Sequence, residues 1–301
     1  PDSSGPTTFY LAPFEESKEH PHCTVKGRIE RSPAPMPGTI PLPRVMDRTV
    51  VSKSDYLASI RSALDSIENT SLEKVVLSRS DWWDETSHPE SVFARKCTEH
   101  PNALVYLLSI PQAGVWLGAT PELLLHQRGD QFETVSLAGT RHADRENWTS
   151  KEIREQSLVT KFIAEQLDEF HAENVVIEPA ADRNYGAFVH LQSRIQFASS
   201  AETPDLLSAL HPTPAVGGEP RAHALEFIAA HEKQSRAYYA GYFGWATGEQ
   251  STFYVNLRCM QWFAEGARIF AGGGIVSGSD AQAEWQETVM KLQSIGQVSR
   301  G

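Results

Sequence analysis

Cysteine is scarce in this sequence, and the cysteines that occur follow no recognisable pattern. The 301 residues contain three, at Cys23, Cys97 and Cys259. Their odd number and the lack of CxxC spacing argue against a disulfide framework and against a structural zinc site. This usage is typical of a protein from a reducing compartment.

Long apolar runs and an excess of positive charge are also missing. The most apolar stretch, residues 102–110, is much shorter than the ~18 residues of a membrane helix. The N-terminus lacks a basic region followed by an apolar core, so no secretory signal is expected. Asp and Glu number 38 against 27 Lys and Arg, a formal net charge of −11, which argues against a surface for nucleic acid or anionic membranes. We therefore expect a soluble cytoplasmic protein that binds neither nucleic acid nor membranes, and no obligatory protein partner is evident.

Proline is concentrated before residue 50 and indicates where the main domain begins. The five prolines between residues 33 and 43 each remove a backbone donor and fix one dihedral angle. Such a stretch is typical of an extended segment that crosses a surface. We expect a proline-rich connector over residues 1–50 and a single domain over residues 51–301.

Short β-type runs separated by turns outnumber helical patterns in this domain. Helices are indicated behind Ser54, after the capping box that Thr149 and Glu152 form, and after Asp280, with shorter helices at residues 204–210 and 221–231. Gly-x-Gly-x-x-Gly and Walker A patterns are absent. We predict an α+β fold in which helices pack outside large antiparallel sheets. Strands are expected at residues 74–79, 103–110, 114–118, 122–126, 132–137, 175–178, 187–197, 238–245, 252–262 and 267–271.

Two of the predicted helices carry paired acidic residues near their N-termini. Glu152 and Glu155 lie three residues apart in one helix, and Glu284 and Glu287 lie three apart in the other. This spacing places both members of a pair on one helical face, while Ile153 marks a different, core-facing side. One interpretation is a solvated face, because the helix dipole favours acids near an N-terminus. The other is an oxygen-rich cluster suited to Mg²⁺, which requires the two pairs to meet in the fold.

Four further features have both a structural and a chemical interpretation. Gly272–Gly274 is either a tight bend or a place where the backbone approaches a ligand closely. Arg258, in an apolar strand, either faces solvent or binds an anion through a bidentate pair. Lys74 is either a solvated strand end or a buried base with a lowered pKa. His211, in a rigid turn-rich segment, is either structural or catalytic.

Eight segments in a fixed order are informative as a whole. They are Lys-Val-Val-Leu-Ser-Arg (74–79), Gly-Ala-Thr-Pro-Glu-Leu-Leu (118–124), Leu-Ala-Gly-Thr-Arg (137–141), Lys-Glu-Ile-Arg-Glu-Gln (151–156), His-Pro-Thr-Pro-Ala-Val-Gly-Gly (211–218), Arg-Ala-Tyr-Tyr-Ala-Gly (236–241), Tyr-Val-Asn-Leu-Arg-Cys (254–259), and Ala-Gly-Gly-Gly-Ile-Val followed by Glu-Trp-Gln-Glu-Thr (271–288). In this order they resemble the chorismate-utilising enzymes, which include isochorismate synthase, salicylate synthase, anthranilate synthase component I and aminodeoxychorismate synthase. The resemblance implies the fold of anthranilate synthase component I, with the chorismate-binding catalytic domain over residues 51–301.

Carried over by position, the resemblance implies a magnesium site. Glu155 and Glu287 match the family's Mg²⁺ carboxylates, and Glu152 and Glu284 match partners that act through water. The Mg²⁺ would bind the ring carboxylate of chorismate. Gln156 departs from the family pattern, because many members have His there. That side chain is not a metal ligand in the resemblance, so we expect little loss of activity.

The same resemblance assigns an acid, a base and a substrate pocket. Glu122 matches the general acid that protonates the departing C4 hydroxyl, and Lys74 matches the base that activates water for attack at C2. Arg258 and Tyr239 match residues that hold the enolpyruvyl carboxylate, and His211 matches a histidine near the ring. The positions implied to bind substrate are Ala138, Gly139, Thr140, His211, Tyr239, Arg258, the backbone of Gly273 and Gly274, and Lys291.

The choice among the family's reactions depends on the nucleophile. Amine-forming members have a glutamine-like residue where this chain has Lys74, and the aminodeoxychorismate type has a lysine at the position of Ala138. Attack by water fits better, so the resemblance implies an isochorismate synthase, an isomerase that supplies menaquinone or siderophore and salicylate biosynthesis. At neutral pH this chemistry requires a lowered pKa for Lys74 and a raised pKa for Glu122.

Three alternatives are compatible with the sequence. Salicylate synthase, which also eliminates pyruvate from isochorismate, uses the same residues. A catalytically inactive homologue would act as a binding or regulatory subunit, although every acid, base and metal position is filled. An unrelated carbohydrate-binding β domain would have none of this chemistry.

Overall fold

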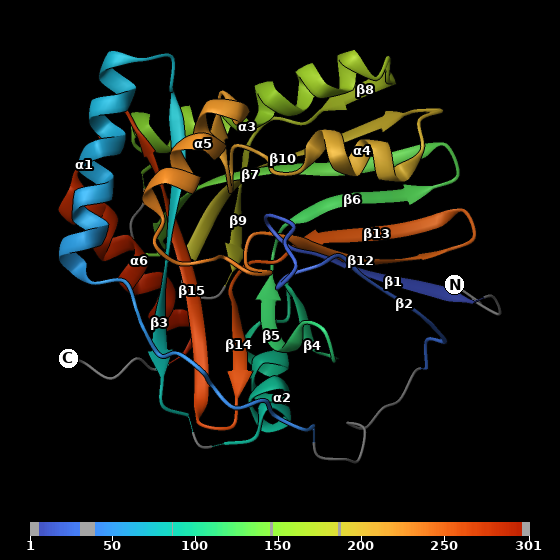
Figure 1. Ribbon diagram of the computed structural model, residues 1–301. Coiled ribbons are helices and arrows are strands. Elements are labelled where there is room, and N and C mark those ends of the chain that lie inside the picture. Colours follow the sequence, from blue (N-terminus) through green and yellow to red (C-terminus); the bar gives the residue numbers. More distant parts are fainter. Residues whose placement is uncertain (1–5, 31–39, 86, 145–146, 186–187, 297–301) are drawn as a thin grey trace.

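The computed structural model describes residues 6–30, 40–85, 87–144, 147–185 and 188–296. Their strands form two antiparallel sheets that pack against each other, with helices around them (Figure 1). This arrangement confirms the predicted α+β fold. Pro33, Pro35 and Pro37 of the expected connector lie outside the described residues, as does Ala187 at the start of one expected strand.

The larger sheet holds nine strands of the described chain, in the order β2-β1-β12-β13-β6-β7-β10-β8, with β9 also paired to β10. Each pairing is antiparallel, as expected for strands joined by short turns. The strands are β1 (Thr7–Ala12), β2 (Cys23–Gly27), β6 (Leu123–Arg128), β7 (Gln131–His142), β8 (Glu173–Ile177), β9 (Ala181–Tyr185), β10 (Phe188–Ala198), β12 (Tyr242–Thr247) and β13 (Gln250–Val255).

The smaller sheet contributes six strands within the same described ranges, in the order β11-β3-β15-β14-β5-β4. Its long antiparallel pair of β3 and β15 includes the glycine-rich segment, where Gly272 pairs with Ser78 and Gly274 with Val76. The strands are β3 (Lys74–Trp83), β4 (Leu104–Ile110), β5 (Gly114–Thr120), β11 (Gly218–Glu219), β14 (Cys259–Phe263) and β15 (Gly266–Val276).

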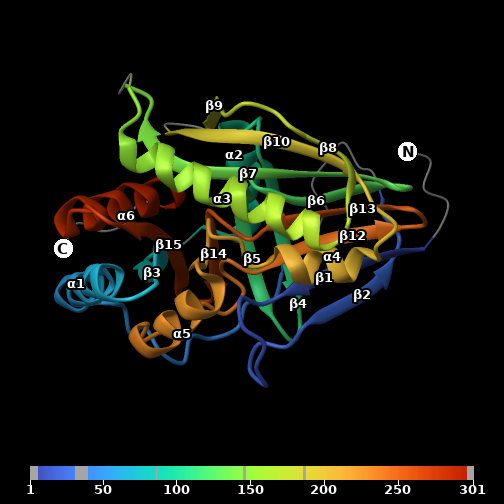
Figure 2. The same ribbon diagram turned by 90° about the horizontal axis from the view of Figure 1, so that it is seen from above.

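The helices divide between the two sheets. Those that contact the smaller sheet are α1 and α6 on β15, α5 on β3, and α2 on β4 and β5, whereas α3 packs on β7 and β10 and α4 on β6. Figure 2 shows α1, α5 and α6 gathered beside β3 and β15, with α3 running along β7 and β10. Their bounds are α1 (Lys53–Asn69), α2 (Pro89–Glu99), α3 (Ser150–Glu169), α4 (Thr203–Leu210), α5 (Arg221–His231) and α6 (Ala281–Ile295). None of these helices of the described chain is long and apolar enough to cross a membrane.

Aromatic side chains from both sheets form the core between them. Trp116 of β5 and Phe270 of β15 belong to the same buried cluster as Phe243 of β12 and Phe253 of β13. The Trp116 and Phe270 rings stack with centroids 5.5 Å apart. Burial of each such side chain contributes roughly 1.5–3 kcal/mol, so the two sheets form a rigid frame.

The expected connector over residues 1–50 is corrected in part by the structure. The strand β1 pairs with β12, and β2 pairs with β1, so this segment forms one edge of the larger sheet. Leu11 and Cys23 are buried against the sheet's core. The sequence pattern did not reveal these strands because each is short and carries few buried side chains.

One expected strand, residues 252–262, divides into two strands that belong to different sheets. The chain leaves the larger sheet after β13 and enters the smaller one at β14. At the crossing, the backbone N–H of Asn256 donates to Gly241 O at 2.7 Å, and the side-chain Nδ2 of Asn256 donates to Tyr238 O at 2.8 Å. Tyr106 of β4 donates to Asn256 Oδ1. Arg258, the residue directly before β14, has φ +49°, in the left-handed region.

Helix starts agree well with the predicted caps. In α3 the Thr149 nitrogen donates to Glu152 Oε2 at 2.6 Å, which confirms the capping box, and Asp280 caps α6. The α1 cap is Ser52 and not Ser54, because Ser52 Oγ accepts from the Asp55 nitrogen at 3.1 Å. The helix α2 was not predicted from the sequence. The cysteines Cys23, Cys97 and Cys259 are all free, as expected.

Candidate active site

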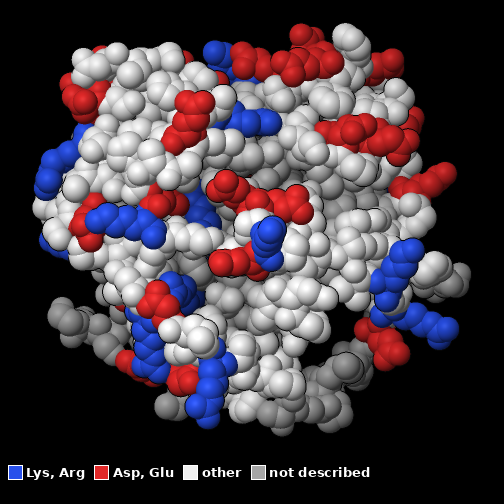
Figure 3. Space-filling model, viewed as in Figure 1, with Lys and Arg blue, Asp and Glu red and all other residues white. Residues whose placement is uncertain are grey.

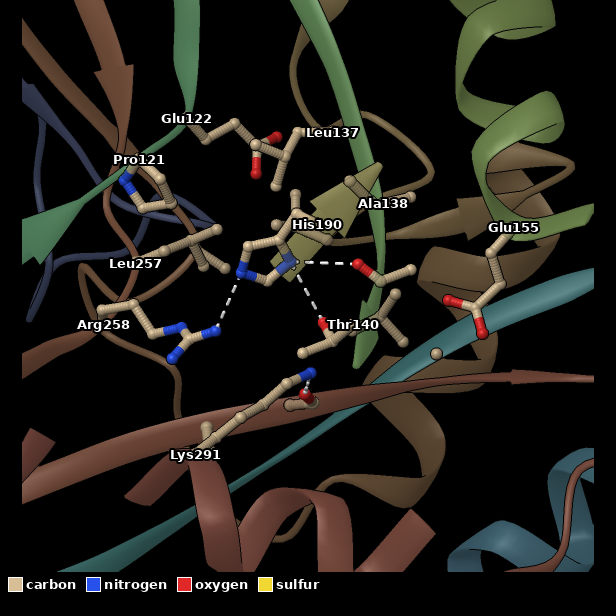
Figure 4. Close-up of a pocket in the computed structure, with 18 of the residues that line it drawn as sticks. Pro121, Glu122, Leu137, Ala138, Thr140, Glu155, His190, Leu257, Arg258 and Lys291 are labelled. Atoms are coloured by element: carbon tan, nitrogen blue, oxygen red, sulfur yellow. Dashed lines mark hydrogen bonds between the residues drawn. The ribbon is translucent and has the colours of Figure 1, made fainter. Parts of the chain in front are cut away.

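A cavity lies where β3 and β15 of the smaller sheet approach β7 and β10 of the larger one, beside α3 and α6 (Figure 4). Its empty volume is about 780 Å³, part of which is open to solvent. The structure therefore brings together residues that are far apart in the sequence. The predicted site residues that line it are Lys74, Glu122, Ala138, Gly139, Thr140, Glu155, Tyr239, Arg258, Gly274, Glu287 and Lys291.

The paired acids are buried, which rules out the solvated-face interpretation for three of them. The exposed fractions of Glu152, Glu155 and Glu284 are 7%, 8% and 2%, whereas Ile153 is 55% exposed. The expectation that Ile153 marks the core-facing side is therefore wrong. The acidic face of α3 turns inward because the cavity and its lysines lie there.

Glu152, Glu284 and His211 do not belong to the cavity lining formed by the described residues. The Glu152 carboxylate accepts from the Thr149 nitrogen and hydroxyl as part of the helix cap. The His211 ring lies one layer behind the cavity, where its Nε2–H donates to the carbonyl of Ala240 at 2.8 Å. Burial lowers the pKa of His211 to about 4, so the ring is neutral. The predicted place of His211 at the cavity wall is corrected: its segment contributes Ala215 and Val216 instead.

The three consecutive glycines of β15 alternate between two sides of the strand. Gly272 and Gly274 line the cavity, and Gly273 is absent from the lining that the described residues form. A Cβ built on Gly273 would face Glu284 Oε2 at 3.5 Å and the Tyr56 hydroxyl at 3.6 Å. Neighbouring strand residues point to opposite faces, so a side chain at Gly273 would point away from the cavity, while the expected role of the Gly273 backbone stays a prediction.

Lysine side chains connect the acidic residues of the two helices. Lys151 Nζ lies 3.2 Å from Glu155 Oε1 and 2.6 Å from Glu284 Oε1. Lys291 Nζ lies 2.6 Å from Glu287 Oε1 and donates to Gly272 O at 2.9 Å. Burial alone would lower the pKa of Lys151, but the surrounding carboxylates raise it, so this lysine is charged. Glu155 of α3 and Glu284 of α6 thus meet, with the Lys151 ammonium group between them.

The oxygen atoms at this meeting point fit a hard divalent cation, although they are not arranged around one. Across the described part of the chain, no three His, Cys, Asp or Glu groups stand in a metal-holding arrangement. Glu284 Oε2 is buried and has no hydrogen-bond partner among the same residues. Mg²⁺ prefers carboxylate oxygens, so the donor set suits Mg²⁺ once Lys151 releases its two carboxylates.

Lys74 and Glu122 are both buried at the cavity wall, with exposed fractions of 1% and 2%. Burial lowers the pKa of Lys74, and Glu155, whose Oε2 is 3.7 Å from Lys74 Nζ, opposes that shift. Burial raises the pKa of Glu122 to about 8, and Lys74 opposes this shift. Both directions agree with the sequence-based expectation. A lysine with a lowered pKa and a carboxyl group with a raised pKa therefore share one cavity.

Glu122→Gln is expected to make the folded protein more stable at neutral pH. Glu122 has a pKa of about 8 when folded and an ordinary value of 4.5. Between these values the unfolded chain releases the Glu122 proton while the folded chain keeps it, so wild-type stability falls as pH rises. The advantage of the variant should grow by about 1.4 kcal/mol per pH unit across this interval. Denaturant unfolding of both proteins at pH 5, 6, 7 and 8 measures it. A pH-independent difference would contradict the raised pKa.

Arg258 presents a cation to the cavity without a direct ion pair, although the Glu287 carboxylate is near enough to favour its charge. Its Nη1 donates to Ser294 Oγ at 3.2 Å and its Nη2 to His190 Nε2 at 3.1 Å, and the guanidinium lies 4.8 Å from the Phe188 ring centroid. Among the described residues it forms no ion pair with Asp or Glu. Burial lowers the pKa of Arg258 to about 10, which still leaves it charged at neutral pH. Such a group needs an anionic ligand, so the wet-face interpretation of Arg258 does not fit.

The outer surface provides no comparable anion site on the side seen in Figure 3. Lys and Arg are scattered among Asp and Glu there, and acidic side chains gather along the upper edge, over α4 and the end of α3.

His190 lines the cavity but was missed by sequence analysis. It is 4% exposed, on β10, and contacts Gly139, Thr140 and Arg258 (Figure 4). The sequence contains eleven histidines, and His190 lies in an ordinary apolar strand. The sequence signal that could have identified His190 is its position, a histidine on the apolar face of a predicted strand.

Gln156, the departure from the family pattern, points away from the cavity. Its Nε2 donates to Ser136 O at 3.0 Å and to Ser136 Oγ at 2.6 Å. These hydrogen bonds of Gln156 therefore connect α3 to β7. This role is consistent with the expectation that the change from His has little effect on activity.

Gly274→Ala is expected to lower kcat/KM on the order of 10²-fold, because small displacements of reacting groups have effects of that size. The new Cβ would lie 2.8 Å from Glu155 Oε2 and 3.1 Å from Lys74 Cε, so both side chains must shift. Gly27→Ala is the matched control, since nothing lies within 4 Å of its Cβ position. Steady-state kinetics of both variants measure the effect. Equal kinetics of the two variants would show that this close approach is unimportant.

Comparisons with known proteins point in one direction. Residues 23–298 match a family described as chorismate binding enzyme. The chain is 34% identical over 262 residues to "Isochorismate synthase 2, chloroplastic" of Arabidopsis thaliana, covering 81% of this chain and 46% of the relative. It is 29% identical over 289 residues to "Salicylate biosynthesis isochorismate synthase" of Pseudomonas aeruginosa, covering 91% and 60%. The chain spans about half to three fifths of the length of these curated relatives.

A solved structure agrees with these matches. The menaquinone-specific isochorismate synthase MenF of Escherichia coli superimposes with a TM-score of 0.76 at 28% identity, covering 88% of this chain and 65% of that chain. The fold implied by the sequence resemblance is thereby confirmed.

Proposed function

Because the chain belongs to the family of chorismate binding enzymes, we propose that it converts chorismate to isochorismate. The observation that carries this proposal is the pair of Lys74 and Glu122, whose pKa values are shifted in opposite directions at one cavity wall. That pair suits exchange of one hydroxyl for another, which needs a base for incoming water and an acid for the leaving group.

Two proton transfers complete the proposed reaction. Neutral Lys74 takes a proton from water as the water oxygen forms a bond to C2 of chorismate. Both ring double bonds shift, from C1=C2 to C1=C6 and from C5=C6 to C4=C5, the bond from C4 to its hydroxyl breaks, and Glu122 gives its proton to the departing oxygen. One water enters and one leaves, and a proton passes back from Lys74 to Glu122 through solvent.

Arg258 and Tyr239, which line the same cavity, would hold one of the substrate's carboxylates. Arg258 has its charge free for an anion, and Tyr239, which also lines the cavity, offers a hydroxyl whose pKa is raised by burial. We assign the enolpyruvyl carboxylate to these two groups. Fixing that carboxylate would place the ring between Lys74 and Glu122, which restricts the attack to one geometry.

We further propose that the enzyme requires Mg²⁺. Glu155, Glu284 and Glu287 would hold the ion, with Glu152 fixing the first turn of α3. When bound, Mg²⁺ would neutralise the ring carboxylate of chorismate. The support is the approach of Glu155 and Glu284 to the same Lys151 ammonium group and the unpartnered Glu284 Oε2.

The choice of water over ammonia rests on two positions. Lys74 can act as a base but not as an ammonia ligand, and Ala138, on the cavity wall, offers no competing amine. One compared relative is named for salicylate biosynthesis and another is menaquinone-specific. We propose that the product feeds menaquinone or siderophore and salicylate biosynthesis, in the cytoplasm, where its three free cysteines would stay reduced.

Product analysis after incubation with chorismate and Mg²⁺ tests this function. We expect isochorismate, and a detectable reverse reaction from isochorismate, because exchange of hydroxyls provides little driving force. Salicylate with pyruvate as the main products would instead identify a salicylate synthase. Binding of chorismate without turnover would identify a catalytically inactive homologue.

A further inference from the structure

We propose that His190 is a positioning residue that holds the Arg258 guanidinium ready for a substrate carboxylate while leaving its charge uncompensated. The proposal rests on the proposed function and adds a residue that acts through Arg258. The hydrogen bonds of the His190 imidazole fix the position of the ring's proton and the orientation of the ring (Figure 4).

The partners of the two ring nitrogens determine the tautomer of His190. Nδ1 lies 3.0 Å from the carbonyl oxygen of Gly139. A carbonyl can only accept, so Nδ1 carries the proton. Nε2 lies 3.1 Å from Arg258 Nη2, and a guanidinium can only donate. Nε2 must therefore present its lone pair to Arg258.

A bulge in β7 provides the carbonyl that fixes this ring. Thr140 pairs with His190 and Ala138 pairs with Leu191, so Gly139 is an extra residue between them. Gly139 has φ +67°, and a Cβ there would lie 3.0 Å from the Glu152 Cβ. The first turn of α3 thus packs against the bulge, which turns the Gly139 carbonyl toward His190.

Neutral partners suit a guanidinium that must bind an anion. Arg258 is held by His190 Nε2 and by the hydroxyl of Ser294, and neither carries negative charge. A carboxylate in place of His190 would hold the Arg258 guanidinium equally well, but it would compete with the substrate carboxylate for the guanidinium charge. Burial, reinforced by Arg258, lowers the pKa of His190 to about 3, so the ring is uncharged throughout the working pH range.

His190→Ala is expected to raise KM for chorismate by about 10- to 100-fold, the effect of losing a hydrogen bond to a charged group, with little change in kcat. His190→Gln can keep an acceptor facing Arg258 and should recover most of the affinity. His126→Ala is the matched control, because His126 lies in the same sheet and bonds Thr252 at 2.9 Å outside the cavity. A lower kcat at unchanged KM would overturn the proposal.

A double-mutant cycle separates action through Arg258 from a general structural role. In an Arg258→Lys background the effect of His190→Ala on KM should largely disappear, because the group that His190 positions is already altered. Full additivity of the two KM effects would overturn the proposal. Melting temperatures of all variants show whether any loss reflects unfolding.

The tautomer is testable even if the proposed function fails. Nitrogen NMR of protein labelled with ¹⁵N-histidine should show His190 neutral and protonated at Nδ1, with the Nε2 signal shifted in Arg258→Lys. Protonation at Nε2, or a charged ring, would overturn the positioning role. Absence of chorismate binding and turnover with the expected tautomer would reject the proposed function while leaving the Arg258 contact established.

Discussion

Replacement of Lys74 by alanine is expected to lower isochorismate formation by about 10²–10⁴-fold, the usual contribution of a general base. Lys74 is 1% exposed and lines the cavity with Glu122. Water is a poor nucleophile, so the loss should appear in kcat. Initial rates with saturating chorismate and Mg²⁺ measure the effect, and calorimetry should show that chorismate still binds.

Lys74→Met provides a second test in which the apolar stem is kept and the amine removed. Lys161→Ala on α3 is the control, because Lys161 is an exposed lysine that pairs with Glu165. A rate close to wild type in both Lys74 variants would place the base elsewhere. Ammonium should yield little aminated product with the wild type, and release of anthranilate or aminodeoxychorismate would contradict attack by water.

Glu155→Gln and Glu287→Gln are each expected to abolish Mg²⁺-dependent turnover with the fold intact. Both side chains line the cavity from different helices, and an amide is a much weaker ligand for Mg²⁺ than a carboxylate. Rate measurements across a Mg²⁺ titration, together with calorimetric Mg²⁺ binding to each variant, test the two steps separately. Glu165→Gln, also on α3 but exposed, should behave as wild type. Full activity in the presence of EDTA would contradict the proposed metal site.

Local patterns in the sequence predicted the elements that depend on neighbouring residues. The capping box at Thr149, the Asp280 cap and the bounds of α5 follow from side chains within one turn of each other. The path of residues 252–262 could not be read in this way. Its apolar alternation is continuous, and the division between sheets depends on contacts of Asn256 with Gly241, Tyr238 and Tyr106, which are distant in sequence.

Sequence motifs identified those parts of the candidate site in which the motif residues themselves line the cavity. Lys74, Glu122 and Arg258, which were predicted from their motifs, all line the cavity, and the structure adds the burial of Lys74 and Glu122. His190 was missed because its role depends on a bulge in another strand and on Arg258, neither of which marks the histidine's own neighbourhood. The position of Lys151 between Glu155 and Glu284 likewise exists only after α3 and α6 meet.

The crossing of the chain at Asn256 has a consequence for how the protein unfolds. This residue is 0% exposed and is bonded to segments that belong to both sheets, so neither sheet keeps its full set of bonds if the other melts. The two sheets should therefore lose structure in one cooperative event, and the backbone amide of Asn256 should exchange with deuterium only when the whole domain opens. A chain cut between β13 and β14 would yield two fragments that cannot fold separately. The cavity, whose walls come from both sheets, would then be present or absent as a unit.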